Sequence, residues 1–545
     1  MSNKSVIGAS IGNCVHVAGV SHFLAIAEKE GFNTIFLGPA VSVETIFKKI
    51  NEYKPKIVAL SYRLTPENVI TLLDEVFSLA KTLDYEPIWV FGGTQPVAQK
   101  AQAYKKFSFI SDGFDEICDS IRFLRGESGT IVSENYGSNL IERIENNSPY
   151  PILRHHFGLP SVLETVDGIE KIAKSKVVDV VSLGTDQNAQ QFLFNVEKMQ
   201  KQFDGAGGVP IRGADDLIRM KKASKCGNYP LMRCYSGTAD VLKNAELLRD
   251  TIDNAWCAVP IFWYSELDGR GDRPIEVSIR EAQELIKWHA DRNIPVEINE
   301  PHHWGLRDSH DVMSVAMAYI SAYNAKKLGV KNYISQYMFN NPNGISFSMD
   351  LARILAMVEV VESLHDENFK TYRETRAGLS LFHADIDIAK GQLAASTFMQ
   401  MILKPHIIHV VGFCEADHAA RPEEVIESCK IVRGVIRHTL EESFSIENDM
   451  TINKRKNELI REAKVLLNFI CNKYSYDDDP LTNSEILADC VKKGYFDAVH
   501  ILKNEKFRGN LNTTFIDGKC VAIDKESKVI LTELERLKGL EKIND

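Results

Sequence analysis

The sequence Ile11-Gly12-Asn13-Cys14-Val15-His16-Val17-Ala18-Gly19 determines how the first part of the chain folds. It follows a short apolar run at 6–10 and precedes an amphipathic segment at 20–31, which predicts a strand, a turn and a helix. His16 lies in the turn, three residues before a glycine. Open α/β sheets bind ligands at the carboxyl ends of their strands, and a neutral imidazole is a good metal ligand. We therefore expect His16 to bind a metal at that edge.

Residues 1–126 alternate between apolar runs and amphipathic segments. Strands are predicted near 6–10, 33–38, 56–62, 86–92 and 107–111. Helices are predicted to start at Gly19, Ser42, Pro66, Pro96 and near Phe114. Strands that alternate with helices indicate a parallel sheet covered on both faces. The sequence thus predicts an α/β, flavodoxin-like (Rossmann-like) domain over 1–126.

Two further signals stand at the ends of later strands. Ser61-Tyr62-Arg63 ends the third predicted strand, and Gly92-Gly93 ends the fourth. Together with His16, they resemble the B12-binding domain of cobalamin enzymes, whose pattern is Asp-x-His-x-x-Gly, then Ser-x-Leu, then Gly-Gly. The resemblance implies a cobalamin cofactor with His16 as its cobalt ligand. It also implies that the nucleotide tail of the cofactor lies beside Gly19, Ser61, Gly92, Gly93 and Thr94.

The sequence departs from this pattern at two cofactor-binding positions, where Cys14 replaces the aspartate and Arg63 replaces the leucine. The aspartate orients the metal-bound imidazole through a hydrogen bond, and a cysteine is a weak partner for that bond. We expect Cys14 to weaken cobalt ligation by His16, unless Asn13 or a water orients the ring instead. A plain flavodoxin-like domain with an incidental histidine is the alternative.

The composition excludes several classes of protein. The chain has 545 residues, of which 44% are hydrophobic and 25% charged, with a net charge of -10. This balance is typical of a soluble globular protein and gives no reason to expect a nucleic-acid partner. No apolar run approaches the roughly 20 residues that span a membrane. Its ten cysteines lack Cys-x-x-Cys spacing, and no signal peptide is evident, so we expect reduced thiols, a cytoplasmic location and no iron–sulfur radical chemistry.

The rest of the chain begins with a segment rich in Gly, Ser and Asn at 127–150, which we interpret as a linker. Between 151 and 445 a second alternating series follows, with apolar strands predicted at 178–183, 231–235, 256–262, 296–299, 333–338, 378–383 and 407–413. Seven strands with an eighth unassigned predict a (β/α)8 TIM barrel, whose function lies on the loops after the strands. Residues 446–545 are expected to form a small α+β appendage.

Short motifs in the barrel resemble a known family. They are Ser236-Gly237-Thr238, Ile298-Asn299, Gly329-Val330-Lys331-Asn332, Phe382-His383 and Glu415-Ala416. They are similar to the large subunit of B12-dependent glutamate (methylaspartate) mutase, here with the small B12-binding subunit fused ahead of it. The resemblance implies a radical carbon-skeleton mutase (an isomerase) that uses adenosylcobalamin and forms a homodimer. Whether it needs a reactivating chaperone stays open.

The barrel departs from that family where the family binds its substrate. The carboxylate-binding arginines of the family fall on Tyr235 and near Glu300, so we expect a small amino or hydroxy acid other than glutamate as substrate. We expect Tyr235, and not Arg233, to line the barrel mouth. The candidate catalytic contacts are Tyr235, Glu300, His302, Tyr337, His383 and Glu415. A single substrate carboxylate would bind to Arg270 or Arg273, with its amino or hydroxyl group facing Glu300.

Two other classes of function remain open at this point. A corrinoid-dependent methyltransferase also combines a B12-binding domain with a barrel. A non-catalytic cobalamin carrier or sensor would explain the missing arginines and Cys14. The dense polar residues on the loops after the barrel strands favour an enzyme, because a decaying site has no reason to keep them.

Overall fold

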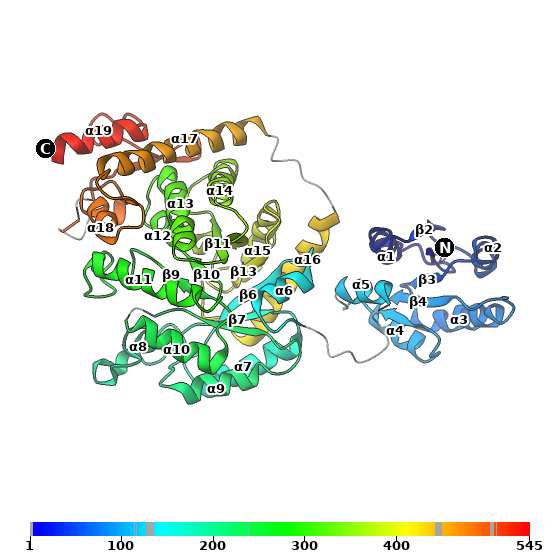
Figure 1. Cartoon of the computed structure of the whole chain (residues 1–545). Helices are drawn as coiled ribbons and strands as arrows, with labels where there is room; N and C mark the ends of the chain where they lie inside the picture. Colours follow the sequence, from blue (N-terminus) through cyan, green and yellow to red (C-terminus); the bar gives the residue numbers. More distant parts are fainter. Residues whose placement is uncertain are drawn as a thin grey trace. The chain divides into compact units, whose positions relative to one another are not determined.

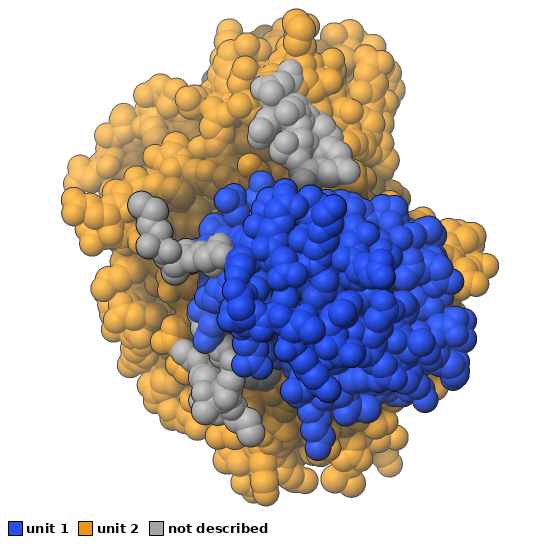
Figure 2. Space-filling view, turned by 90° about the vertical axis from the view of Figure 1, so that its right-hand side faces the viewer, with its two compact units in different colours: residues 1–134 blue, residues 135–545 orange. Residues whose placement is uncertain are grey.

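The computed structural model describes residues 4–113, 115, 117–126, 136–237, 239–441, 449–501, 506–507 and 509–544. The chain divides into two compact units, residues 1–134 and residues 135–545, which Figure 2 distinguishes by colour. Each unit has its own sheet and its own hydrophobic core.

Unit 1 is a five-stranded parallel sheet in the order β2-β1-β3-β4-β5. Its strands are β1 (Ser5–Ser10), β2 (Asn33–Phe36), β3 (Ile57–Tyr62), β4 (Ile88–Gly93) and β5 (Phe109–Ser111). Its helices are α1 (Ala18–Lys29), α2 (Val43–Tyr53), α3 (Pro66–Ala80), α4 (Gln95–Gln102) and α5 (Ile117–Arg125). The predicted flavodoxin-like fold is confirmed. The strand order reverses between β1 and β3, where sheets of this order bind ligands.

Unit 2 contains an eight-stranded parallel sheet in the order β8-β7-β6-β13-β12-β11-β10-β9. The strands are β6 (Ile152–Phe157), β7 (Val180–Leu183), β8 (Leu231–Cys234), β9 (Cys257–Val259), β10 (Val296–Ile298), β11 (Asn332–Phe339), β12 (Lys370–Ala377) and β13 (Ile407–Val410). The sheet curls into a nearly closed barrel, so the predicted barrel is confirmed. Across the gap between β8 and β9, the Arg233 guanidinium lies 4.8 Å from the centre of the Trp256 ring.

Two strands of the barrel differ from the prediction. The strand that the sequence left unassigned is β6. The strand predicted at 378–383 is wrong, because the segment that pairs with β11 and β13 is β12, at Lys370–Ala377. Both missed strands carry charged residues that point into the barrel. The apolar run at 378–383 lies after β12 and contains only a turn of 3-10 helix, Leu379–Leu381.

Helices surround the barrel strands, as Figure 1 shows. They are α7 (Val162–Ser175), α8 (Gln187–Phe192), α9 (Ala214–Ala223), α10 (Val241–Ile252), α11 (Ile275–Ala290), α12 (Glu300–Gly305), α13 (Asp311–Lys327), α14 (Phe347–Glu362), α15 (Ile386–Met401) and α16 (Pro422–Glu441). Short 3-10 turns lie at Val196–Lys198, Lys201–Phe203 and Val499–Ile501.

Helix α6 (Leu140–Asn147) covers the amino-terminal end of the barrel. Its Leu140 and Ile144 belong to one apolar cluster with inward-facing residues near the starts of the strands, namely Ile152, Val180, Leu231, Ile334 and Ile407. Arg143 of the same helix donates to the carbonyls of Asn228 and Tyr229, which precede β8. An apolar layer therefore seals this end. Part of the predicted linker, 127–135, lies outside the described residues.

The last part of the chain is α+β, as predicted. It contains α17 (Met450–Lys473), α18 (Ser484–Lys492), the antiparallel hairpin of β14 (Thr513–Ile516) and β15 (Lys519–Ala522), and α19 (Glu533–Asn544). Buried ion pairs join it to the barrel helices: Arg455 binds Asp311 at 2.8 Å, and Glu533 binds His310 at 2.9 Å. Of the helices that the structure describes, none is both long enough and apolar enough to cross a membrane.

Candidate functional site

His16 lies exposed on the loop between β1 and α1. The buried Cys14 holds one side of its ring, because Cys14 Sγ lies 3.8 Å from His16 Nδ1. The same sulfur accepts the backbone N–H of Arg63 at 3.3 Å, which fixes it between the ends of β1 and β3. With Nδ1 directed at the sulfur, the other ring nitrogen, Nε2, is left for a metal.

The strand ends beside His16 form an open cradle. Ser10, Ser61 and Gly92 lie in one row across β1, β3 and β4. A Cβ built on Gly19 or on Gly92 would meet no atom within 4 Å, so the backbone there is open to a ligand. At Gly93, by contrast, a Cβ would lie 2.8 Å from the Tyr62 carbonyl oxygen, so the packing of β3 on β4 requires glycine.

This arrangement fits the cofactor that the sequence predicts. The exposed imidazole of His16 stands where the strand order reverses, between β1 and β3. The backbone at the strand ends beside it is not covered by side chains of the described residues. Thr94 directly precedes α4, and Arg63 is exposed after β3. The predicted cofactor-binding residues of unit 1 therefore lie along the carboxyl ends of three neighbouring strands.

The interior of the barrel holds a network of buried charges. Glu297 of β10 accepts a hydrogen bond from Arg233 of β8 at 2.8 Å and lies 3.7 Å from Arg154 of β6. Arg154 also pairs with Glu374 of β12. Further donors to Glu297 are Trp256 at 2.8 Å, Gln336 at 2.8 Å and Asn299 at 3.1 Å. The carboxylate is thus bonded from several strands at once.

Burial shifts the pKa values of these groups. Desolvation raises the pKa of Glu374 to about 7 and lowers the pKa of Arg154 to about 10. His156 and His409, which stand above this layer, have pKa values well below the ordinary one because burial and the guanidinium of Arg154 both disfavour the imidazolium. Both histidines are therefore neutral near pH 7.

A cavity of about 290 Å³ opens above the charged network, at the carboxyl ends of β6, β7, β12 and β13. Its polar lining comes from His155, His156, Arg376, His409 and Glu415. In the part of the chain that the structure describes, Arg376 has one hydrogen bond, from Nε to the Ala377 carbonyl at 3.2 Å. Its terminal nitrogens are therefore available to a ligand. A guanidinium group can donate two parallel hydrogen bonds to a carboxylate, so a carboxylate ligand suits this position.

Glu415 completes the polar lining. Burial raises its pKa, against the lowering effect of the Arg376 charge. It follows β13, as the sequence predicted, and it lines the same cavity as Arg376. The site thus offers one cationic and one acidic group to a small molecule.

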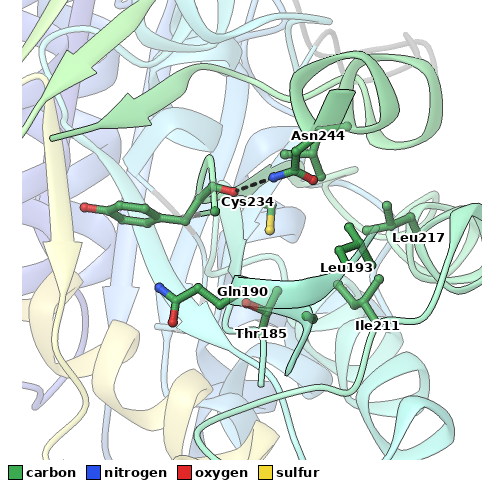
Figure 3. Close-up of a pocket in the computed structure, with 11 residues that line it drawn as sticks. Thr185, Gln190, Leu193, Ile211, Leu217, Cys234 and Asn244 are labelled. Carbon is green, nitrogen blue, oxygen red and sulfur yellow. Dashed lines mark hydrogen bonds between the residues drawn. The ribbon is translucent and has the colours of Figure 1, made fainter. Parts of the chain in front are cut away.

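A second cavity, shown in Figure 3, is too small for a substrate. It measures about 20 Å³ and lies between the ends of β7 and β8 and helices α8 and α10. Its lining includes Thr185, Gln190, Leu193, Ile211, Leu217, Cys234 and Asn244. Beside it, Asn244 Nδ2 donates to the Tyr235 carbonyl at 3.4 Å. A cavity of this size holds about one water.

Glu300, which the sequence predicted as a substrate contact, does not line the cavity. It is fully buried, and its Oε1 accepts the backbone N–H groups of Ile261 and Phe262 while its Oε2 accepts Trp304 Nε1 at 3.0 Å. Desolvation raises its pKa to about 7 in spite of these bonds. Both carboxylate oxygens are therefore used to join the loop after β9 to α12.

Tyr337 and His383 also lie away from the cavity. Tyr337 is next to the inward-facing Gln336 on β11, so it points outward, and it packs in the core between the strands and their helices. His383 is exposed after β12, where its Nδ1 accepts the backbone N–H of Asp385 at 2.9 Å. His383 was predicted at the end of a strand because the strand was expected at 378–383, whereas β12 ends at Ala377.

The two predicted carboxylate-binding arginines are engaged elsewhere. Arg270 lies over the Tyr264 ring and pairs with Asp268 at 3.1 Å. Arg273 pairs with Glu281 and donates to the Tyr264 carbonyl at 2.9 Å. Neither of them lines the cavity.

Tyr235 and His302 lie nearer to the charged network. The Tyr235 hydroxyl accepts Asn299 Nδ2, and its ring centre lies 5.3 Å from the Arg233 guanidinium. Tyr235 and Arg233 thus both point inward. The expectation that only Tyr235 does so was wrong, because positions i and i+2 of a strand share a face. His302 is buried in α12, with a pKa held well below the ordinary value by burial and by the charge of Arg376.

Most of the charged and polar groups inside the barrel were not predicted from the sequence. They are the charged residues Arg154, Arg233, Glu297, Glu374 and Arg376 and the neutral histidines His156 and His409. A signal for them was present, because Arg154-x-His156, Arg233-x-Tyr235 and Glu374-x-Arg376 repeat polar residues at the two-residue period of a strand face.

Comparison with known proteins bears on unit 1. Residues 4–115 match the family described as the B12 binding domain, so this unit is a B12-binding domain. Among curated proteins there is no match. A novel cobalamin-binding protein from Desulfitobacterium hafniense DCB-2 is 23% identical over 24% of this chain and 60% of its own, with a TM-score of 0.20. The cobalamin-dependent S-adenosylmethionine radical enzyme OxsB, with aqua-cobalamin and S-adenosylmethionine bound, is 13% identical over 80% of this chain and 56% of its own, also at 0.20. The chain thus spans less than two thirds of either protein, and at such scores we draw nothing from them.

Proposed function

We propose that the protein is an adenosylcobalamin-dependent radical isomerase that rearranges the carbon skeleton of a small amino or hydroxy acid. The observation that carries this proposal is the presence, in one chain, of a B12-binding domain and a barrel with a cavity at its mouth. Into the lining of that cavity Arg376 brings a guanidinium whose one hydrogen bond to the described residues leaves its terminal nitrogens to a ligand. Bound adenosylcobalamin supplies a carbon-centred radical when its cobalt–carbon bond breaks. The barrel residues bind and orient the substrate and exclude water from it.

Arg376 is the group best suited to bind the substrate. The inward-facing side chains include three guanidinium groups, Arg154, Arg233 and Arg376, against the two buried carboxyls Glu297 and Glu374. Burial also raises the pKa of Glu374 to about 7, so positive charge exceeds negative charge even when Glu415 of the cavity is counted, and this balance favours an anionic ligand. Glu415 at the same cavity repels a second carboxylate and accepts a hydrogen bond from an amine or hydroxyl. The proposed substrate therefore has one carboxylate, bound by Arg376, and an amino or hydroxyl group near Glu415.

Substitution of Arg376 tests this assignment. Arg376→Leu should lower kcat/KM by about 10- to 100-fold, because the loss of charge-assisted hydrogen bonds to a carboxylate costs roughly 1.5–3 kcal/mol. Arg376→Lys should recover part of the loss. The assay offers small monocarboxylic amino and hydroxy acids with adenosylcobalamin and detects rearranged isomers by mass spectrometry. Arg373→Leu is the matched control, because Arg373 pairs with Glu362 outside the barrel.

Three outcomes would contradict the proposal. Efficient interconversion of glutamate and 3-methylaspartate would mean that the barrel accepts two carboxylates after all. Turnover that requires methylcobalamin and a methyl acceptor would identify a corrinoid methyltransferase. Equal activity of the Arg376→Leu variant and the wild type would remove Arg376 from the substrate site.

Cys14 provides a test on the cofactor side. Cys14→Asp should strengthen cobalamin binding with His16 on cobalt, on the order of 10- to 100-fold, because a carboxylate would accept both the Arg63 N–H and His16 Nδ1–H where the thiol now stands. Binding titrations give the affinity. Electron paramagnetic resonance of the Co(II) form, with nitrogen-15-labelled histidine, shows whether the histidine is the ligand.

Cys14→Ser serves as the size-matched control, and His16→Ala should abolish the histidine coupling. Equal or weaker binding by Cys14→Asp would mean that another group already orients His16. An unchanged spectrum of His16→Ala would mean that this residue is not the cobalt ligand.

A further inference from the structure

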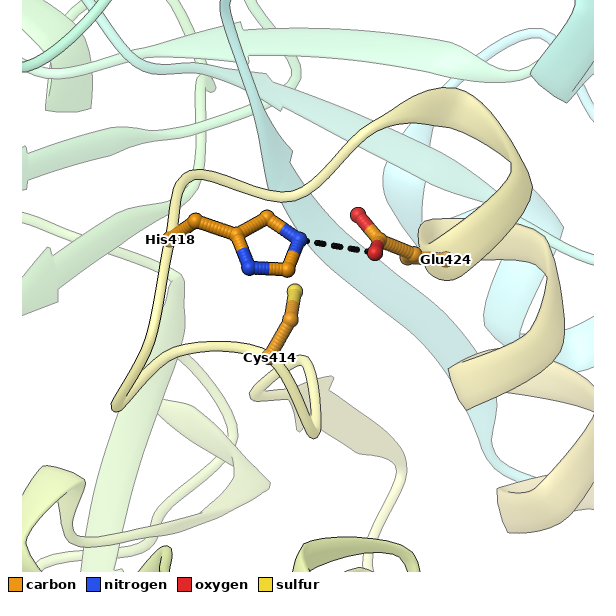
Figure 4. Close-up of side chains that lie close together, drawn as sticks. All are labelled: Cys414, His418 and Glu424. Atoms are coloured by element: carbon orange, nitrogen blue, oxygen red, sulfur yellow. Dashed lines mark hydrogen bonds and ion pairs between the residues drawn. The ribbon is translucent and has the colours of Figure 1, made fainter. Parts of the chain in front are cut away.

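The loop between β13 and α16 brings together three side chains that nothing in the proposed reaction uses. Figure 4 shows Cys414, His418 and Glu424, whose thiol, ring nitrogen and carboxylate oxygen all lie within 4.8 Å of one another. Cys414 is buried, and the other two are half-buried. Thiolate, imidazole and carboxylate are the ligand types that bind zinc in proteins.

The backbone holds these side chains in place. The N–H groups of Asp417 and His418 both donate to the Cys414 carbonyl at 2.9 Å, so a tight turn sets Cys414 and His418 on the same side. Glu424 stands in the first turn of α16, where its Oε2 accepts the backbone N–H of Arg421 at 2.8 Å. Its Oε1 is thereby directed to His418 Nε2, at 2.7 Å.

The surroundings of the group also match those of metal ligands. Asp417 Oδ2 lies 2.6 Å from His418 Nδ1, and a carboxylate on the far ring nitrogen is the usual partner of a metal-bound histidine. His155, 4% exposed, has no partner for its Nε2 among the described residues. This nitrogen and Cys414 Sγ both border Gly412, at 3.2 and 3.5 Å from the position of a Cβ there.

We propose that Cys414, His418 and Glu424 bind a zinc ion, separate from the cobalt of the cofactor. On binding, the thiol proton and the proton between His418 and Glu424 pass to solvent, because metal ligands are deprotonated. Three protein ligands leave a fourth tetrahedral position open for water or another ligand. The same loop lines the cavity of about 290 Å³ through Glu415, Ala419 and Ala420, so the ion fixes the rim of the barrel mouth.

Zinc content of the full-length chain tests this proposal. The protein is stripped with a chelator, returned to zinc and analysed by elemental mass spectrometry, which separates zinc from cobalt. We expect one zinc per wild-type chain. In competition with a chromophoric chelator, Cys414→Ser, His418→Gln and Glu424→Gln should each bind more than about tenfold more weakly, since even changes outside the ligand set cost 10- to 100-fold.

Two variants act as controls. Glu423→Gln changes the exposed neighbour of Glu424 on the same helix, and Cys226→Ser removes a thiol elsewhere in the barrel unit. Both should keep their zinc, and circular dichroism should show that every variant is folded. If the wild type takes up no stoichiometric zinc, or if Cys414→Ser retains it with wild-type affinity, the proposal is wrong.

Discussion

Glu297→Leu is expected to lower the free energy of unfolding of the barrel unit by about 3–5 kcal/mol, the cost of breaking a buried ion pair on one side. Glu297 is wholly buried and pairs with Arg233 at 2.8 Å. Its removal leaves the charge of Arg233 in the barrel with no carboxylate. It also takes away an acceptor from Trp256 and Gln336.

The arginines on either side have little else to bind. Nε and Nη1 of Arg233 are already without hydrogen-bond partners among the described residues, and Arg154 would keep only Glu374 as a carboxylate partner. Glu374 compensates poorly, because burial raises its pKa to about 7 and favours its neutral form. The energetic cost therefore falls on the unpaired guanidinium groups and not on the lost side-chain volume.

Urea unfolding of the full chain measures the effect. Glu362→Gln is the control, because it breaks a half-buried pair with Arg373 outside the barrel and should cost at most about 1 kcal/mol. The double variant Glu297→Leu/Arg233→Met should recover part of the stability, since it removes the guanidinium that Glu297→Leu leaves without a carboxylate, while Arg154 keeps Glu374. If Glu297→Leu unfolds at the wild-type urea concentration, the network does not stabilise the fold.

The second large effect is a loss of stability in mild acid. Six histidines of the barrel unit, five of them buried and His156 half-buried, have lowered pKa values because desolvation disfavours the imidazolium. The pKa values of His155 and His289 are about 4, and those of His156, His302, His303 and His409 lie well below 6.5. In the unfolded chain the same groups titrate near 6.5. Below that pH the unfolded state binds more protons than the folded state, so stability falls as the pH falls.

Buried carboxyls act in the opposite direction. Burial raises the pKa of Glu300 and Glu374 to about 7 and that of Asp497 to about 6, so these groups keep their protons in the folded state and favour it in acid. Asp311, Asp350 and Glu415 also have raised pKa values, and His406 has a lowered one. The histidines still outnumber the carboxyls, seven to six, so unfolding takes up roughly one to three protons near pH 5.5. At about 1.4 kcal/mol per proton and pH unit, stability should fall by roughly 1–4 kcal/mol per pH unit.

Urea midpoints at pH 7.5 and pH 5.5 check this sign, and the midpoint should be lower at pH 5.5. His289→Gln removes one of the six histidines at a site in α11, away from the cavity, where glutamine can still donate to the Leu285 carbonyl. It should make the pH dependence less steep. A midpoint that stays constant or rises in acid would show that the histidines are protonated in the folded protein.

The sequence predicted unit 1 well and the barrel less well, for a physical reason. In unit 1, strands such as β1 and β3 are buried on both faces, so their sequences are continuous apolar runs. In the barrel, one face of each strand points at a charged interior. β12, with the sequence Lys370-Thr371-Tyr372-Arg373-Glu374-Thr375-Arg376-Ala377, therefore resembles a surface segment, and the apolar run after it was taken for the strand.

The candidate site shows the same difference. The predicted cofactor residues come from local motifs, and the structure places them together along one edge of the sheet. The substrate contacts depend on which face of each strand and loop points inward, and a single sequence leaves that open for polar residues. Glu415 follows a strand with a clear apolar pattern and lines the cavity, whereas Arg376 was missed because the strand that carries it, β12, was not predicted.

The apolar seal under α6 has a consequence for the order of events in the barrel. With Leu140 and Ile144 packed across its amino-terminal end, the described part of the barrel admits a ligand from the opposite, carboxyl-terminal end, where the cavity lies. A molecule that reaches Arg376 must arrive and depart through that end. Any group that covers the mouth during a reaction encloses the molecule bound there. The substrate therefore has to bind before the mouth is covered, and the product leaves only after it is uncovered.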